Sequence, residues 1–165
     1  MLSKNLVKKL NDHVNLEFYS SNLYLQMSSW CEAKGLEGCA AFLRAHAKEE
    51  ADHMERLFTY VNETGSMAVV GNIKAPPTEF SSVSDLFQKV YDHECSITKE
   101  INGLVSAALK EEDYSTFNFL QWYVAEQHEE EHIFKLILDK ISIIGEEGAG
   151  LFFIDRAIGG MLGKK

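Results

Sequence analysis

Apolar residues recur at steps of three and four along most of this chain, the spacing that lines up side chains on one face of an α-helix. The pattern predicts four long helices, at about residues 3–32, 39–63, 82–110 and 117–143. A shorter apolar segment follows and predicts a fifth helix at about residues 147–159. No segment alternates apolar and polar residues as a strand does. The sequence therefore predicts an all-α fold built on a four-helix bundle.

The connection between the second and third predicted helices is long, at about residues 65–81, and it contains Pro76 and Pro77. Proline disfavours a helix there. An extended segment of about 17 residues reaches roughly 55 Å, whereas a helix of about 28 residues is only ~42 Å long. The connection can therefore cross the whole bundle and make the second and third helices parallel. We expect a single domain over residues 1–165, with the bundle in residues 3–143.

The charge of the chain limits its function. Acidic residues outnumber basic ones by 25 to 16, and the formal net charge is -9. This balance argues against a nucleic-acid-binding protein, which needs a basic face. It is compatible with a protein that binds cations.

Other features favour a cytoplasmic protein. The chain has no apolar run of the roughly 18 residues that span a bilayer, so we expect no membrane association. The first segment, MLSKNLVKKLNDH, lacks the uninterrupted apolar core of a signal peptide. Cys31, Cys39 and Cys95 are odd in number and lack C-x-x-C spacing, which argues against a disulfide framework or a thiolate zinc site. We expect all three to be small core residues.

Each long helix carries a glutamate near its midpoint with apolar residues seven positions away on both sides. These four residues are Glu17, Glu50, Glu94 and Glu130. Glu55 is different, since Lys48 and Asn62 lie at the same offsets, and it is expected on the surface. On the fourth helix, Glu126, Glu129 and Glu131 also have apolar neighbours, which predicts a helix buried on more than one side. Helix midpoints meet at one depth in a bundle, so the four acids should converge.

Converging carboxylates repel one another unless protons or cations neutralise them. Glu50 and His53 form an E-x-x-H step, which places both side chains on one face of a helix where they can bind one metal ion. Carboxylates with one or two imidazoles suit Fe(II) and Mn(II). A glutamate that bridges two ions would give a dinuclear site. The other histidines of these helices, His46, His128 and His132, are expected at the surface or an interface.

The segments around these acids resemble the bacterial non-haem ferritins. They are NLEFYSSNLYLQMSSW around Glu17, FLRAHAKEEADHMERL around Glu50, YDHECSIT around Glu94 and TFNFLQWYVAEQHEEEH around Glu130. The resemblance covers nearly the whole chain, including the long crossover and the short C-terminal helix. It implies a ferritin-like four-helix bundle that stores iron.

The resemblance also implies roles for individual residues. Glu17, Glu50 and His53 would hold a first iron, with Glu50 bridging to a second iron held by Glu94 and Glu130. Gln127 would lie beside the second iron as a weak ligand or hydrogen-bonding group. The remaining implied residues are Glu49, Glu126 and Glu129, which would hold a third iron with Glu130, and Tyr24 and Trp122, which would lie near the centre and supply electrons. The implied reaction is oxidation of Fe(II) by O2 or H2O2, in a hollow homo-oligomer of about 24 subunits.

Two departures separate this sequence from the haem-binding bacterioferritins. The residue after Glu50 is Ala51, where those proteins carry a haem-ligating methionine, so no haem is expected. Only Met27 and Met54 remain as remote haem ligands. The fourth helix reads Gln127-His128-Glu129-Glu130 and lacks a second E-x-x-H. The second iron would therefore be held more weakly and pass to a store.

Two other functions remain open from the sequence. A di-iron oxygenase or peroxidase would use the same metal centre on an organic substrate, and it would need an apolar pocket beside the metals. A non-catalytic helical interaction module would neutralise the buried acids with Lys or Arg, and it would not bind metal stoichiometrically.

Overall fold

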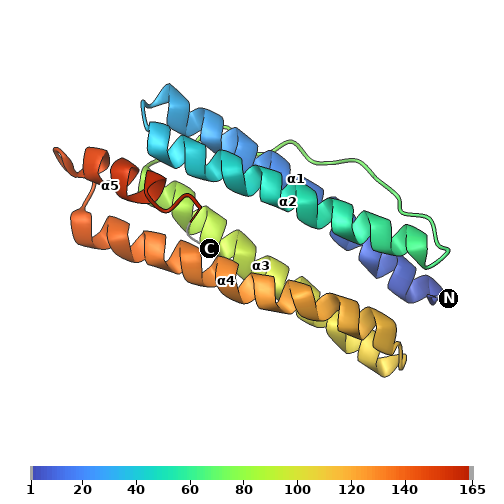
Figure 1. The fold of residues 1–165 in the computed structure, drawn as a ribbon. Coiled ribbons are helices and arrows are strands. Elements are labelled where there is room, and N and C mark those ends of the chain that lie inside the picture. The colour runs from blue at the N-terminus through green and yellow to red at the C-terminus, as the bar shows by residue number, and fades with distance from the viewer. Residues whose placement is uncertain (1, 164–165) are drawn as a thin grey trace.

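The computed structural model describes residues 2–163, and within this range every regular element is a helix. The five helices are α1 (Lys4–Ala33), α2 (Glu37–Glu63), α3 (Val83–Lys110), α4 (Tyr114–Ile144) and α5 (Gly150–Gly159). The first four lie side by side as an elongated bundle, and the short α5 covers one end (Figure 1). Among the helices of the described residues, none is both long and apolar enough to cross a membrane.

The long connection has the course that the sequence predicts. It runs along the bundle from the end of α2 to the opposite end, where α3 begins (Figure 1). Two asparagines of α1 hold it in place. Asn11 accepts a hydrogen bond from the Val69 N–H (2.8 Å), and Asn15 accepts one from the Gly71 N–H (2.6 Å). Asn15 also donates a hydrogen bond to the Val69 carbonyl oxygen (2.9 Å). Side chains of α1 therefore satisfy both the N–H and the carbonyl group of Val69.

The helix ends follow from local sequence, with one correction. Ser3 and Ser82 cap α1 and α3, since their hydroxyls accept hydrogen bonds from the third N–H that follows. The predicted start of the fourth helix at about residue 117 is wrong, because α4 already begins at Tyr114. Asp113 is its N-cap, and its carboxylate accepts from both the backbone N–H and the hydroxyl of Thr116 (3.0 Å each). Because of this cap, α4 begins three residues earlier than the sequence predicts.

The core is divided into two apolar clusters. One cluster lies at the end of the bundle that α5 covers, and it includes Met27, Leu43, Phe87 and Phe134. The other lies at the opposite end, where α2 ends, and it includes Leu10. Each long helix contributes to both clusters. Between them lies a layer of buried polar side chains at the helix midpoints. This layer is the candidate functional site.

Two expectations about the core need correction. The sequence predicts burial of α4 on more than one side, yet its buried residues form a single stripe at three- and four-residue steps: Thr116, Leu120, Tyr123, Gln127, Glu130, Phe134, Ile137 and Ile141. Glu129 is exposed and Glu131 is partly exposed. Cys31 and Cys39 are buried core residues as expected, but Cys95 is only partly buried.

Helix α5 supplies the N-terminal cap that α2 lacks. The residue at the N-cap of α2 is Leu36, which has no side-chain acceptor. Asp155 of α5 accepts hydrogen bonds from the N–H groups of Gly38 (3.0 Å) and Cys39 (2.7 Å) instead. Its negative charge also lies at the positive end of the α2 dipole. The backbones are so close here that a Cβ on Gly38 would lie 2.2 Å from the Asp155 carbonyl oxygen.

The substitution Gly38→Ala is therefore expected to destabilise the protein by about 1–3 kcal/mol, because α5 must move away from the new methyl group. Gly103→Ala in α3 is the matched control. It meets nothing within 4 Å and should raise stability by up to about 1 kcal/mol through helix propensity. Thermal unfolding of both variants measures the difference. Equal melting temperatures for the two would show that the α2–α5 contact carries no such constraint.

Candidate metal centre

Seven buried polar residues predicted as site residues occupy the layer between the two apolar clusters. They are Glu17 and Tyr24 from α1, Glu50 and His53 from α2, Glu94 from α3, and Gln127 and Glu130 from α4. None of them is more than 4% exposed. The apolar residues above and below on each helix cause this burial, because they drive that face of every helix into the bundle. The predicted convergence of the four midpoint acids is thus present in the fold.

Glu17, Glu50 and His53 offer ligand atoms that all lie within 4.8 Å of one another. Within α2, the His53 Nδ1 is 3.4 Å from the Glu50 Oε2, as the E-x-x-H spacing predicts. The ring of His53 is held between aromatic neighbours, at 5.2 Å from Trp122 and 6.3 Å from Tyr123. Its backbone carbonyl oxygen accepts a hydrogen bond from the Tyr123 hydroxyl (2.7 Å). Two aromatic residues of α4 therefore hold His53 of α2 in place.

Glu94 is oriented by two partners. Its Oε1 accepts a hydrogen bond from the Tyr24 hydroxyl, and its Oε2 accepts one from the Gln127 side-chain amide (3.0 Å). Gln127 also donates to the backbone carbonyl oxygen of Glu94 (3.2 Å). Tyr24 and Gln127 therefore both lie beside Glu94.

His46 corrects a prediction. It was expected at the surface or an interface, but it is only 5% exposed. Its Nδ1 lies 3.3 Å from the Glu130 Oε2 and 3.7 Å from the Glu49 Oε2, and the three residues form a second group that could hold a metal ion. The other two histidines of that prediction, His128 and His132, are exposed as expected.

A third group joins Glu49 and His53 to Glu126. Glu49 therefore belongs to the second and the third group, and His53 links the third group to Glu17 and Glu50. Glu129 is exposed, and it belongs to none of the three groups found among residues 2–163. Trp122 is partly buried between the His53 ring and the Arg56 guanidinium, which lies 4.4 Å from the indole centroid.

Buried carboxylates change one another's affinity for protons. Burial, followed by the charges of Glu17 and Glu94, raises the pKa of Glu50 well above its usual range. Burial and the charge of Glu130 raise the pKa of Glu94 to about 8. Burial alone would raise the pKa of Glu17 as well, but His13, with further contributions from Glu50 and His53, outweighs burial and the pKa is lowered. Burial and Glu94 raise the pKa of Tyr24, which keeps its phenol protonated as a donor.

Two histidines escaped the sequence reasoning, and the same signal could have found both. His13 stands four residues before Glu17, and His46 stands four residues before Glu50. An interval of four places two side chains on one helix face. The His13 Nε2 indeed lies 2.9 Å from the Glu17 Oε1. The spacing H-x-x-x-E in two helices was the available indication.

The arrangement of oxygen and imidazole ligands suits two or three adjacent divalent transition-metal ions. The Oε2 of Glu17 and the Oε1 of Glu50 are buried and receive no hydrogen bond from any residue in 2–163. Unsatisfied buried carboxylate oxygens are costly unless a cation or proton occupies the space between them. The ion pairs of Glu17 and Glu50 involve histidines rather than Lys or Arg, which disfavours the interaction module.

Comparison with known proteins identifies the family of this chain. Residues 7–144 match the family model described as a ferritin-like domain. The chain belongs to the ferritin family. This match confirms the resemblance to ferritins that the sequence indicated.

Relatives of this ferritin cover almost its whole length. It is 58% identical to a probable bacterial non-heme ferritin-like protein of Haemophilus influenzae, over 98% of each chain. It is 53% identical to the bacterial non-heme ferritin of Escherichia coli O157:H7, over 96% of each chain. The open pore ferritin of Archaeoglobus fulgidus has the same fold, with a TM-score of 0.94, 40% identity, and coverage of 96% of this chain and 98% of that one. These matches confirm the all-α, ferritin-like fold class with its crossover and fifth helix.

The hydrogen bond from Tyr24 to Glu94 gives a direct prediction. Tyr24→Phe keeps the buried ring but removes the hydroxyl, so Glu94 loses one of its two side-chain partners. We expect the rapid phase of Fe(II) oxidation to slow by about tenfold, the lower end of the usual effect of removing a ligand's hydrogen-bond partner. Stopped-flow absorbance measures this rate. Tyr114→Phe, at an exposed position, is the control, and equal rates in both variants would contradict the role given to Tyr24.

Proposed function

We propose that this protein is a ferroxidase that stores iron. Its substrate is Fe(II), which it oxidises at the centre in the bundle and keeps as a ferric oxyhydroxide mineral. The observation that carries the proposal is the buried layer in which Glu17, Glu50 and His53 lie together with Glu94 and Glu130. Membership of the ferritin family supports the same function.

In this proposal, Glu17, Glu50 and His53 bind the first Fe(II), and Glu50 bridges to the second. Glu94 and Glu130 bind the second Fe(II), with Gln127 beside it. In this assignment His53 is the only histidine ligand, and Glu94 and Glu130 give the second ion carboxylate oxygens. Hard oxygen ligands favour Fe(III) over Fe(II), which makes oxidation more favourable and weakens the hold on Fe(II).

A third iron is proposed next to this pair, on the side of Glu49. The resemblance to ferritins implies Glu49, Glu126, Glu129 and Glu130 as its ligands. Glu49 and Glu126 share a potential metal-binding group with His53, which supports that part of the assignment. Glu129 would have to turn inward from its exposed position.

The chemistry needs two electrons at a time. Each of two Fe(II) ions gives one electron to O2, which takes up two protons and leaves as H2O2. With H2O2 as the oxidant, the same two electrons and two protons yield two molecules of water. The protein holds the two ions at bridging distance so that both electrons transfer together. Tyr24, which donates a hydrogen bond to Glu94, and Trp122, whose ring packs against His53, would act as additional electron donors, as the resemblance implies.

We further propose that the chain assembles as a homo-oligomeric shell of about 24 subunits. Large apolar side chains lie exposed near the end of α4 and on α5, including Ile143 (85% exposed), Phe152 (64%) and Phe153 (54%). Exposed apolar groups of this size are typical of interfaces. A cytoplasmic location, with no nucleic acid or membrane partner and no haem, stays a prediction of the sequence. The oxygenase or peroxidase alternative is not favoured, since the named relatives are ferritins.

The test is iron loading of the purified protein with particle sizing. Fe(II) is added in air in small portions, and the iron that stays soluble is measured by size-exclusion chromatography with light scattering. We expect hundreds of iron atoms to be retained in a particle of about 24 chains. Oxidation that stops at about two irons per chain, in a monomer or dimer, would contradict storage and favour the oxygenase.

A further inference from the structure

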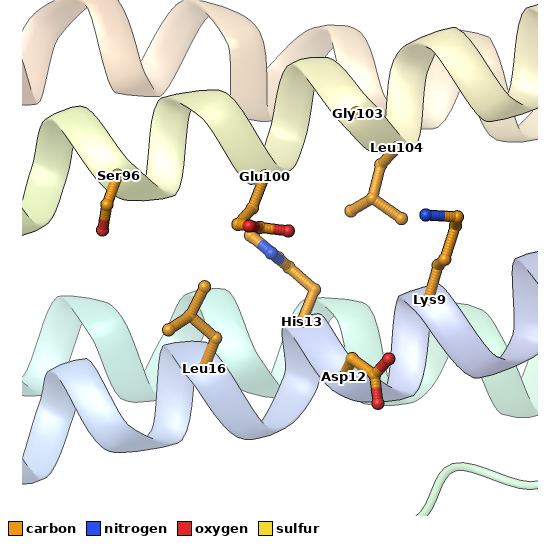
Figure 2. Close-up of a pocket in the computed structure, with 8 residues that line it drawn as sticks. All are labelled: Lys9, Asp12, His13, Leu16, Ser96, Glu100, Gly103 and Leu104. Atoms are coloured by element: carbon orange, nitrogen blue, oxygen red, sulfur yellow. The ribbon is translucent and has the colours of Figure 1, made fainter.

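A groove lies between α1 and α3, and His13 in its wall connects it to Glu17 of the metal centre. It has a volume of about 370 Å³ and is lined from α1 by Lys9, Asp12, His13 and Leu16 and from α3 by Ser96, Glu100, Gly103 and Leu104. Figure 2 shows that the His13 side chain extends from α1 toward α3, while the Glu100 carboxylate extends from α3 toward α1. His13 is the residue that the groove shares with the centre, because it also contacts Glu17.

The His13 side chain is almost completely buried, with 3% of the residue exposed. Its ring packs edge-on against Tyr123 at 6.3 Å, which fixes its orientation. The Nε2 lies 2.9 Å from the Glu17 Oε1. The pair is close enough for an ion pair, yet neither atom has a hydrogen-bond partner among residues 2–163. A close contact between two unsatisfied atoms requires an explanation.

A cation that binds both atoms provides one. Bonds of about 2.1 Å from a divalent transition metal to an imidazole nitrogen and a carboxylate oxygen, at roughly 90° to each other, place the two ligand atoms about 3.0 Å apart. This matches the observed separation of 2.9 Å. The second oxygen of Glu17 remains available to bind a metal together with Glu50 and His53, and these three residues are called the inner group below.

The charges around the groove are mixed. Glu100 and Asp12 are acidic, but Asp12 pairs with Lys8 on the surface (2.6 Å), and Lys9 is basic. Lys9 lies beside Leu104, toward the end of the groove away from Ser96 (Figure 2). A cation would therefore approach along the side of Glu100, where the nearest charge is negative.

We propose that His13 Nε2 and Glu17 Oε1 form an entry site for Fe(II), where an ion from the groove pauses before it moves to the first iron position. Water molecules complete its coordination, and Glu100 stabilises the ion from across the groove. This inference rests on the proposed ferroxidase function, since it adds a step before that reaction. It assigns to His13 a role in metal binding that is separate from the ligands of the centre.

Crystals of the wild-type protein soaked with Co(II) provide the first test. Co(II) does not react with oxygen at the centre on this time scale, and its anomalous scattering locates it. We expect one peak at the Glu17, Glu50 and His53 group and a second, weaker peak between His13 and Glu17. This measurement needs no variant, so it does not depend on how a substitution folds.

Kinetics of His13→Phe provide the second test. Phe keeps a planar ring against Tyr123 but has no ligand atom. We expect the Fe(II) concentration at half-maximal rate to rise by about tenfold, the range seen when a group beside a metal ligand is lost, with a smaller change in the maximal rate. His132→Phe, at an exposed position of α4, is the control and should change neither value.

The outcomes separate this inference from the proposed function. A Co(II) peak at the inner group, without one at His13, together with an unchanged half-saturating concentration, overturns the entry site and leaves the ferroxidase centre intact. Absence of peaks at both places overturns the two together. A His13 peak that disappears in His13→Phe, while the inner peak remains, supports the inference.

Discussion

Replacement of Glu50 by Gln is expected to slow the rapid phase of Fe(II) oxidation by at least about 100-fold. Glu50 is the carboxylate proposed to bridge the two iron ions, and a neutral amide cannot bridge them in the same way. Its side chain is within 4.8 Å of both other ligands of the first position. Stopped-flow absorbance after mixing apo-protein with Fe(II) and oxygen measures the rate.

The same substitution should leave the apo-protein at least as stable as the wild type. Burial and neighbouring carboxylates raise the pKa of Glu50 well above its usual range, so its charge is unfavourable in the folded state. Gln removes that charge without removing volume. Glu55→Gln, at an exposed position of the same helix, is the control for oxidation. A Glu50→Gln protein that folds normally and oxidises Fe(II) at the wild-type rate would refute the proposed bridging role.

Metal affinity at the centre is expected to rise about fivefold from pH 7 to pH 8, because the metal displaces the proton of Glu94. Burial and the charge of Glu130 raise the pKa of Glu94 to about 8, so Glu94 is largely protonated at neutral pH. A metal ion must displace this proton, which costs binding free energy below the pKa and costs nothing well above it. Calorimetric titration with Zn(II), which is redox-inactive, measures the affinity at each pH.

The raised pKa of Glu94 should also make the stability of the apo-protein depend on pH. An acid whose pKa is higher in the folded than in the unfolded chain stabilises the fold fully below the unfolded pKa, and the contribution is lost as the pH rises through the folded pKa. The apo-protein should therefore be less stable at pH 9 than at pH 6, and bound metal should remove the difference. Glu94→Gln should flatten both pH dependences. A Zn(II) affinity that is constant from pH 7 to pH 8 would contradict the raised pKa.

Much of the fold follows from the sequence because helical periodicity is a local signal. The stripe that contains Leu10, Glu17 and Tyr24 identifies α1 and its buried face at once. The length of the crossover with its two prolines then decides the topology, since it must cross the whole bundle. The start of α4 was missed because a cap depends on one hydrogen bond, here from Thr116 to Asp113, rather than on a repeated pattern.

The candidate site was predictable where a residue stands in an apolar stripe, and it was less so where partners come from another helix. Glu50 and His53 could be paired from their spacing alone. The contact of His46 with Glu130 joins α2 to α4, and the cap that Asp155 gives to α2 joins residues far apart in the chain. Neither depends on a local pattern. Only the packing angle between helices determines which side chains meet.

The central claim is that the buried carboxylate layer binds and oxidises iron in pairs. Anaerobic titration of the apo-protein with Fe(II), followed by a pulse of oxygen, tests it most directly. We expect saturation at two to three Fe(II) per chain and then rapid oxidation with about one O2 consumed for two Fe(II). Wild-type protein that binds no Fe(II) before oxygen is added, and then oxidises it no faster than buffer alone, would contradict the account.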